Sequence, residues 1–283
     1  MKKIKCFALL LAVLLLAGCG ANGNTGEKTG VAATTGPVAQ FAAAIVDGTG
    51  LTVTQVIADS VSCLHDYSLS VGQMETIERS RVVLVSGAGL EDFMEDALAA
   101  AEQIVDCSRG IELQQNDEGD DPHIGLDPDR AAQMAENICA GLSDVYPEHQ
   151  AIFQANLEGL LQRFSDLKAY GEAKLADVSC RELITFHDGF GYLASAFDLE
   201  ILRAIEEESG SEASAAELTE IVDLVQTHSL PAIFTEANGS TAAASVIRGE
   251  TGVPYFSLDM AIGGSDYFEA MTHNIDTLKE ALS

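Results

Sequence analysis

Short apolar runs, rich in β-branched and aliphatic residues, alternate along the chain with longer segments of helical periodicity. The run Arg81-Val-Val-Leu-Val-Ser86, for example, is typical of a strand buried on both faces. The predicted strands are 31–35, 51–57, 81–86, 103–106, 183–186, 200–204, 231–235 and 253–258. The predicted helices are 37–46, 71–80, 90–101, 129–145, 148–178, 190–197, 214–227, 240–248 and 267–282. This order predicts parallel βαβ units with right-handed crossovers, and therefore an α/β fold.

The segment 148–178 is the longest predicted helix, and its apolar residues recur near helical spacing. About 30 residues at 1.5 Å per residue span about 45 Å, which exceeds the width of one small lobe. Gly159 and Gly171 weaken the helical pattern, and an ordinary long core helix is the alternative. Because the alternation of strand and helix restarts after this segment, we interpret it as a rigid strut between two lobes.

The predicted organisation is thus an N-terminal lobe over 31–146, a linking helix over 147–178 and a C-terminal lobe over 179–283. Each lobe is expected to contain a mostly parallel sheet flanked by helices. A chain of 283 residues with 47% hydrophobic residues can bury the cores of two such lobes.

The first residues have the pattern of an export signal. Lys2, Lys3 and Lys5 precede an apolar stretch over 7–16, which is too short to span a bilayer. Leu16-Ala-Gly-Cys19 looks like the lipobox of bacterial lipoproteins, although an ordinary signal with a chance cysteine would share part of this pattern. We therefore predict a signal peptide over 1–18, lipid attachment at Cys19 and a flexible tether over 19–30. The mature protein is then extracytoplasmic and anchored to the bacterial cell membrane through lipid alone.

The charge balance limits the possible partners. With 44 acidic against 15 basic residues, the chain has a formal net charge of −29, so nucleic acid is excluded as a partner. An acidic surface concentrates cations instead. After Cys6 and Cys19, the thiols at 63, 107, 139 and 180 form no C-x-x-C pair, and both disulfides and buried thiols are compatible with their spacing.

Four potential metal ligands come after predicted strands: His187, Glu236 and Asp259 follow their strands directly, and His65 lies in the loop after the strand 51–57. In open parallel sheets, ligands bind outside the carboxyl ends of the strands. If the two lobes face each other across the linking helix, these side chains can converge on one cleft.

His123 lies on a short stiff loop of its own. Pro122 restricts the backbone before it, and Asp127-Pro128 is typical of a helix start. An imidazole held between two such points beside carboxylates suits a metal ligand. The remaining histidines, His149, His228 and His273, are assigned to solvent or packing.

The order and spacing of several motifs resemble the zinc/manganese-type solute-binding lipoproteins of bacterial ABC importers (cluster A-I, solute-binding protein family 9). The resemblance extends from about Val31 to the C-terminus. The residues that carry it are His65-Asp-Tyr67, Ser86-Gly-Ala-Gly-Leu-Glu91, Asp121-Pro-His123, Leu126-Asp-Pro128, Thr185-Phe-His-Asp-Gly-Phe-Gly-Tyr192, Glu212-Ala-Ser214, Phe234-Thr-Glu236 and Leu258-Asp259.

The resemblance implies two α/β lobes joined by a backbone helix, with a divalent metal bound at their interface. It implies His65, His123, His187 and Asp259 as metal ligands, with Glu236 supporting them or serving as an alternative ligand. It further implies a monomeric receptor, not an enzyme, that delivers its ion to the permease subunits of an ABC importer.

Three departures from the family pattern concern the surroundings of this site. Gly125 stands where the family usually has tryptophan, and Ala213 replaces a common proline. The acidic segment 116–121 replaces the histidine-rich loop of many zinc members. These departures argue against a zinc-collecting role of that loop, but they leave the ligand set intact.

Three imidazoles and one carboxylate suit tetrahedral Zn²⁺, whereas Mn²⁺ prefers more oxygen ligands. We therefore expect zinc, with manganese as the alternative metal. Three other functions compete with transport. They are a zinc-dependent hydrolase with an open three-histidine site, a surface adhesin with a structural metal, and a receptor for a chelated or organic ligand. A receptor for a chelated or organic ligand needs a wide aromatic or basic pocket, and a chain with 6% aromatic residues and no tryptophan offers few residues for one.

Overall fold

The computed structural model describes residues 28–58, 67–116, 119–206 and 213–283. The predicted signal peptide over 1–18, Cys19 and most of the tether lie outside these residues, as do Cys63 and His65. Within the described part of the chain, no helix combines the length and the apolar character that crossing a membrane requires.

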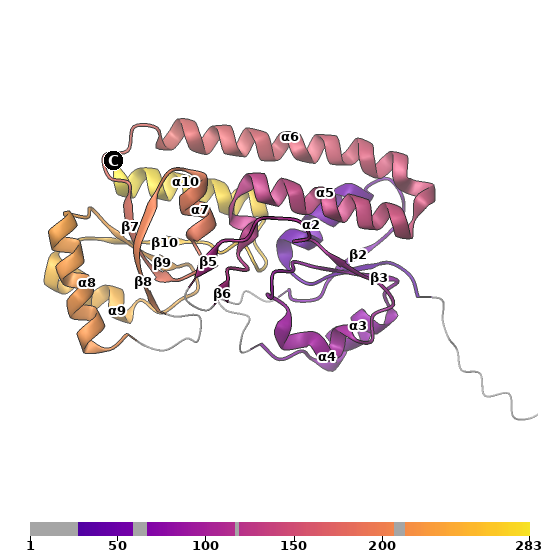
Figure 1. The fold of residues 1–283 in the computed structure, drawn as a ribbon, viewed down its shortest axis with the longest axis horizontal. Helices are drawn as coiled ribbons and strands as arrows, with labels where there is room; N and C mark the ends of the chain where they lie inside the picture. Colours follow the sequence, from indigo (N-terminus) through magenta and orange to yellow (C-terminus); the bar gives the residue numbers. More distant parts are fainter. Residues whose placement is uncertain (1–27, 59–66, 117–118, 207–212) are drawn as a thin grey trace, which may run out of the picture.

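In the described residues, two four-stranded sheets form the framework of the protein, one in each half of the chain (Figure 1). The first has the order β2-β1-β3-β4, with β1 Val31–Ala33, β2 Val53–Gln55, β3 Val82–Val85 and β4 Ile104–Asp106. The second has the order β10-β9-β7-β8, with β7 Glu182–His187, β8 Glu200–Glu206, β9 Ile233–Glu236 and β10 Tyr255–Leu258. Every strand pair in both sheets is parallel, as the βαβ alternation predicts.

Helices cover both faces of the first sheet. In Figure 1, α2 (Gly36–Val46) and α5 (Pro128–Val145) lie above it, and α3 (Val71–Arg79) and α4 (Glu95–Leu98) lie below it. The helices of the second half are α7 (Gly191–Ala196), α8 (Ala215–His228), α9 (Ala242–Thr251) and α10 (Tyr267–Leu282). The α/β class with two helix-flanked parallel sheets is confirmed.

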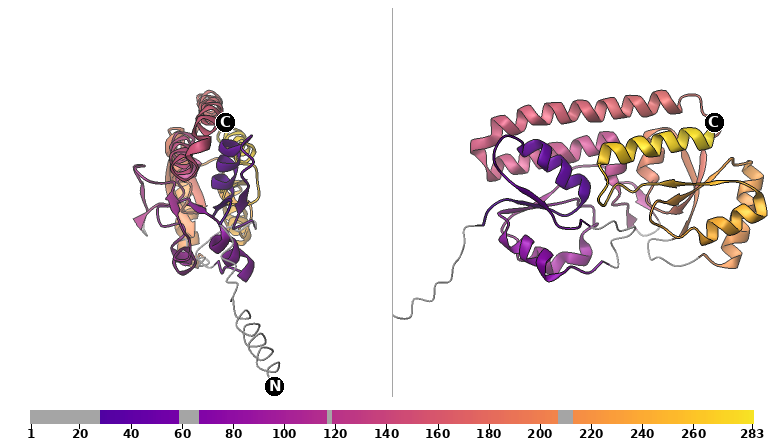
Figure 2. Two further views of the ribbon diagram at one scale, coloured as in Figure 1. Left: turned by 90° about the vertical axis from the view of Figure 1, so that its right-hand side faces the viewer. Right: turned by 180° about the vertical axis from the view of Figure 1, so that it is seen from behind.

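The long helix α6, Gln150–Leu175, runs along the same side of both lobes beside α5 and α10 (Figures 1 and 2). Its 26 residues span about 39 Å. The single turn before it, η3 over Pro147–His149, is a 3₁₀ helix, so the regular helix is shorter than the predicted segment 148–178. The prediction of one long backbone helix joining the lobes is confirmed.

Aromatic residues from three helices pack together beneath α6. The rings of Phe41 on α2 and Phe164 on α6 meet edge to face at 5.0 Å. Tyr267, the first residue of α10, contacts both of them, at 5.0 Å and 5.8 Å. Because edge-to-face pairs add to the stabilisation from burial, this cluster holds the start of α10 firmly against the first lobe.

The two glycines of α6 have different surroundings, which explains why they do not disrupt the helix. Gly159 is exposed, and a Cβ there would meet nothing within 4 Å. Gly171 is buried, and a Cβ there would lie 2.2 Å from Cε1 of Phe197. Gly171 thus allows α6 to approach the second lobe closely.

The two positions provide a matched test of this packing. We expect Gly171→Ala to lower the free energy of unfolding by about 1–3 kcal/mol through overpacking. Gly159→Ala is expected to raise it by about 0.5–1 kcal/mol, because alanine loses less backbone entropy in a helix. Urea unfolding with chelator present measures both values, and equal effects would contradict a close contact at Gly171.

Two local predictions are wrong. The predicted helix 90–101 is reduced to a 3₁₀ turn, η1 over Asp92–Met94, followed by the single turn of α4. The Glu91 side chain bonds back to the end of β3, so the chain completes tight turns before any helix can begin. The acidic segment 116–121 is not simply a loop, because β5 (Gln115–Asn116) and β6 (Gly119–Asp120) pair as antiparallel strands.

The cysteines in the described part of the chain are thiols. Cys107 and Cys139 are buried, and Cys180 is partly buried. Burial raises the pKa of Cys107 well above the ordinary value for a thiol, and the neighbouring carboxylates of Glu91 and Asp106 raise it further. Cys107 therefore stays protonated and acts as a small apolar core residue.

Candidate metal site

His123 lies in the loop between β6 and the 3₁₀ turn η2, Ile124–Leu126, and only 8% of its surface is exposed. Its Nδ1 lies 2.8 Å from Oδ1 of Asp121, and the same oxygen accepts a hydrogen bond from its backbone N–H at 2.9 Å. A carboxylate can only accept, so the facing Nδ1 carries the proton. The Asp-Pro-His sequence therefore fixes both the backbone and the tautomer of His123 locally.

His187 is the last residue of β7, and Glu236 is the last residue of the neighbouring strand β9. Both side chains are buried, with 6% and 8% exposed. Nδ1 of His187 lies 3.0 Å from Oε1 of Glu236. The parallel register of the second sheet brings these two strand ends together, and the carboxylate orients the imidazole as Asp121 orients His123.

The two imidazoles face each other across the junction of the lobes. Nε2 of His123 and Nε2 of His187 are 3.4 Å apart, with the ring planes at 87°. Because each Nδ1 faces a carboxylate, Nε2 is the nitrogen that each ring turns toward the other ring, where one cation can contact both. Two nitrogen ligands at 2.0–2.1 Å from a tetrahedral zinc ion lie about 3.3–3.4 Å apart. The observed spacing fits that geometry.

Asp259 follows β10 directly and is held by α10. Its backbone N–H donates to Asn274 Oδ1 and its backbone carbonyl accepts from Asn274 Nδ2, both at 2.7 Å. Its carboxylate oxygens accept hydrogen bonds from Ala261 N–H at 2.7 Å and Ser265 Oγ at 2.9 Å. The side chain is therefore engaged by its own loop, and ligation by Asp259 stays a prediction.

Of the sequence-predicted ligands, the structure brings together His123 and His187, with Glu236 in contact with His187. His65 lies outside the described residues. Within the described ranges, no group of three His, Cys, Asp or Glu side chains is arranged to hold one ion. The described part of the site is thus a pair of oriented imidazoles.

Two features of the site were not assigned a role from the sequence. The first is Asp121, whose position two residues before a histidine, with proline between them, is itself a signal for this hydrogen bond. The second is Gly189, where a Cβ would lie 2.6 Å from Cδ2 and 2.8 Å from Nε2 of His187. No local pattern reveals this close approach, because it depends on the path of the loop after β7.

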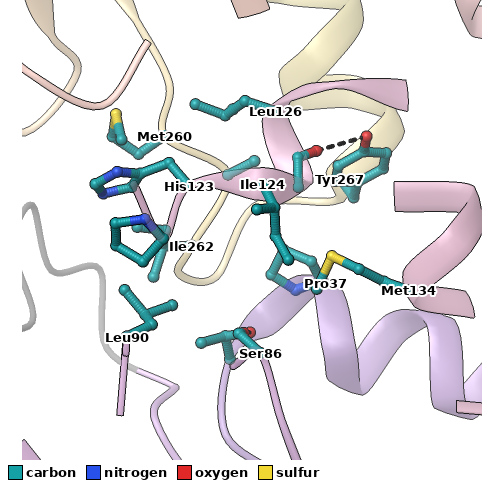
Figure 3. A pocket seen from close by; sticks show the side chains of 14 residues that line it. Pro37, Ser86, Leu90, His123, Ile124, Leu126, Met134, Met260, Ile262 and Tyr267 are labelled. Carbon is teal, nitrogen blue, oxygen red and sulfur yellow. Dashed lines mark hydrogen bonds between the residues drawn. The ribbon is translucent and has the colours of Figure 1, made fainter. Parts of the chain in front are cut away.

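A mostly apolar pocket adjoins His123 at the junction of the lobes (Figure 3). Ser86 and Leu90 line it from the first lobe, and Met260, Ile262 and Tyr267 line it from the second. The His123 loop contributes its own residues between these two sets. His123 is therefore bordered by surfaces from both halves of the chain.

Glu91 supports the end of the first sheet beside this pocket. Its carboxylate accepts hydrogen bonds from Thr34 Oγ1 at 2.5 Å, Ser86 N at 2.7 Å and Gly87 N at 3.0 Å. Burial raises the pKa of this carboxyl, and these hydrogen bonds partly oppose the shift. Glu91 thus holds the ends of β1 and β3 together at the edge that faces the other lobe.

Comparison with known proteins identifies the family to which this chain belongs. The family model for the zinc-uptake complex component A, periplasmic (ZnuA), matches residues 31–281, and the chain belongs to this family. The resemblance inferred from the sequence motifs is therefore confirmed, and the family is one of zinc-uptake receptors.

Individual relatives agree with this assignment. The chain is 26% identical to the high-affinity zinc uptake system protein ZnuA of Bacillus subtilis, over 98% of this chain and 96% of the relative. It is 29% identical to the zinc-binding protein AdcA of Streptococcus pyogenes serotype M6, over 70% of this chain, but it spans only 39% of that longer relative. The solved structure of the periplasmic zinc binding protein TroA from Treponema pallidum superposes with a TM-score of 0.82 at 25% identity, covering 90% of this chain and 99% of TroA.

Proposed function

We propose that this protein is an extracytoplasmic receptor that binds one Zn²⁺ between its two lobes and delivers it to the permease subunits of an ABC importer. His65, His123, His187 and Asp259 would be the ligands, with Glu236 orienting His187 or serving as an alternative ligand. Cys19 would carry the lipid that anchors a monomer to the membrane. Manganese is the alternative cargo.

The observation that carries the proposal is the Nε2–Nε2 distance of 3.4 Å between two buried imidazoles from different halves of the chain. Asp121 and Glu236 face the Nδ1 atoms and orient both rings, so that the two Nε2 atoms lie at the separation that a shared zinc ion requires. An imidazole pair favours zinc over manganese, and the zinc-uptake family agrees with that preference.

The chain's own residues explain how the ion can be bound and released reversibly, without any covalent reaction. The neutral imidazoles are oriented before the ion arrives, so little reorganisation opposes binding. Each lobe has its own sheet, and one large hydrophobic core extends through both lobes and α6, so we expect the fold to persist without the metal. Protons compete with the ion for the imidazole nitrogens, so affinity should fall in acid.

The test is elemental analysis of the mature protein after competition between equal concentrations of zinc and manganese. We expect one zinc per chain, removable by a chelator with an unchanged circular dichroism spectrum. Absence of bound metal would refute the proposal. Unfolding by the chelator would support a structural metal, as in the adhesin alternative. An exchangeable water on the metal, together with hydrolytic activity, would support the enzyme.

A further inference from the structure

The loop that carries His123 is bonded at both ends to tyrosines from the C-terminal half of the chain. The hydroxyl of Tyr192, on α7, donates to the carbonyl of Asp121 at 3.0 Å. The hydroxyl of Tyr267, at the start of α10, donates to the carbonyl of Gly125 at 2.9 Å (Figure 3). The two carbonyls stand two residues before and two residues after His123.

Both phenols are themselves rigidly placed. Tyr192 and Tyr267 are completely buried. Tyr192 Oη also accepts a hydrogen bond from Gln114 N–H at 2.8 Å. The same hydroxyl therefore contacts the backbone at Gln114 and at Asp121, on either side of the β5–β6 hairpin that precedes His123. Tyr267 is fixed by its ring contacts with Phe41 on α2 and Phe164 on α6. Its backbone N–H also donates a hydrogen bond to Oε1 of Gln40 at 2.8 Å.

The loop's own hydrogen bonds leave these two carbonyls to outside partners. Asp121 Oδ1 organises the N–H and Nδ1 of His123, and His123 O accepts from Leu126 N–H at 3.1 Å. A buried carbonyl that loses its donor carries a desolvation cost, so the loop is more stable where the phenols hold it. Burial raises the pKa of both phenols, and each therefore remains a hydrogen-bond donor over the physiological range.

We infer that Tyr192 and Tyr267 are positioning residues for metal capture, which hold the His123 imidazole opposite His187 before the ion arrives. This inference rests on the proposed function. The His123 loop belongs to the first lobe by sequence, but two groups of the second half determine its place. Contacts at the junction between the lobes thus determine the relative position of the two imidazoles. Metal affinity therefore depends on two hydroxyls that do not contact the metal.

Tyrosine-to-phenylalanine variants test this inference because they remove only the hydroxyl. We expect Tyr192→Phe and Tyr267→Phe each to weaken zinc binding about fivefold, the effect of one hydrogen bond of about 1 kcal/mol. The zinc dissociation rate should rise in parallel. Zinc titration in competition with a chromophoric chelator measures the affinity of the full mature protein.

Tyr146 provides the matched control. It is buried, and its hydroxyl donates to the carbonyl of Gly30 at 3.1 Å, so Tyr146→Phe removes a bond of the same kind. We expect Tyr146→Phe to lower the urea midpoint of the zinc-free protein about as much as the other variants while leaving zinc affinity unchanged. The absorption spectrum of bound Co²⁺ adds a second readout, which should change only in Tyr192→Phe and Tyr267→Phe.

The outcomes separate the two proposals. If the wild type binds zinc and loses it in His123→Ala, but all three phenylalanine variants keep wild-type affinity, the positioning role is wrong and the receptor stands. Equal losses in Tyr146→Phe and the other two variants would also refute it, because general destabilisation would then explain the effect. If the wild type binds no zinc, the proposed function itself fails.

Discussion

Replacing His123 with alanine is expected to lower zinc affinity by more than about 100-fold. Loss of a group that merely orients a ligand costs about 10- to 100-fold in metal affinity, so loss of the ligand itself should cost more. The variant should still fold, because Asp121 Oδ1 can keep its hydrogen bond to the backbone N–H of residue 123. Isothermal titration with zinc, after removal of metal by a chelator, measures the change.

His273→Ala is the control for this experiment, because His273 is an exposed residue of α10. It removes one imidazole from the protein without changing the interior, and we expect wild-type affinity. Equal zinc affinity in His123→Ala and His273→Ala would mean that the imidazole pair is not the metal site. His187→Ala should repeat the loss seen with His123→Ala, since both nitrogens face the same point.

Gly189→Ala is expected to weaken zinc binding by about 10- to 100-fold, the range found when a metal ligand loses its orientation. The added Cβ would lie 2.6 Å from His187 Cδ2, 2.8 Å from His187 Nε2 and 2.6 Å from Met260 Cε. The methionine end can move, but the imidazole is held by Glu236. The ring must therefore turn away from Glu236 or from His123, and either movement spoils the geometry of the pair.

The matched substitution is Gly249→Ala in the same lobe, where a Cβ on α9 would meet nothing within 4 Å. We expect this variant to bind zinc like the wild type and to be slightly more stable. The same competition titration applies to both variants, with circular dichroism as the check on folding. Wild-type affinity in Gly189→Ala would show that the ring of His187 does not need its present orientation.

Much of the fold follows from local patterns. The strand and helix periodicities are set by the residues of each element alone, and the long segment after Pro147 is helical because its sequence repeats at helical spacing. Errors arose where hydrogen bonds between residues three to five positions apart overrode the periodic pattern. Glu91 bonds to the end of β3 and shortens the predicted helix, and the segment around Asn116 pairs as a hairpin.

Part of the candidate site also follows from local patterns in the sequence. Placement of His187 and Glu236 at strand ends and of His123 on a stiff loop is readable from the sequence, because strand ends and Asp-Pro helix starts have local signatures. The hydrogen bond from Asp121 to His123 also has a local signal, at a separation of two residues. The identity of the donors thus comes from the chain itself.

The kind of fold, the family and the residues able to donate to a metal can all be read from local patterns in the chain. The geometry of those residues appears only in the folded protein: the 3.4 Å between imidazoles 64 residues apart, the approach of Gly189 to His187, and the phenols that hold the His123 loop. Tyr192 and Tyr267 reach that loop from 71 and 142 residues away. Periodicity and turn chemistry act over a few residues, whereas such contacts exist only once both sheets pack with α6 and α10 around a shared core.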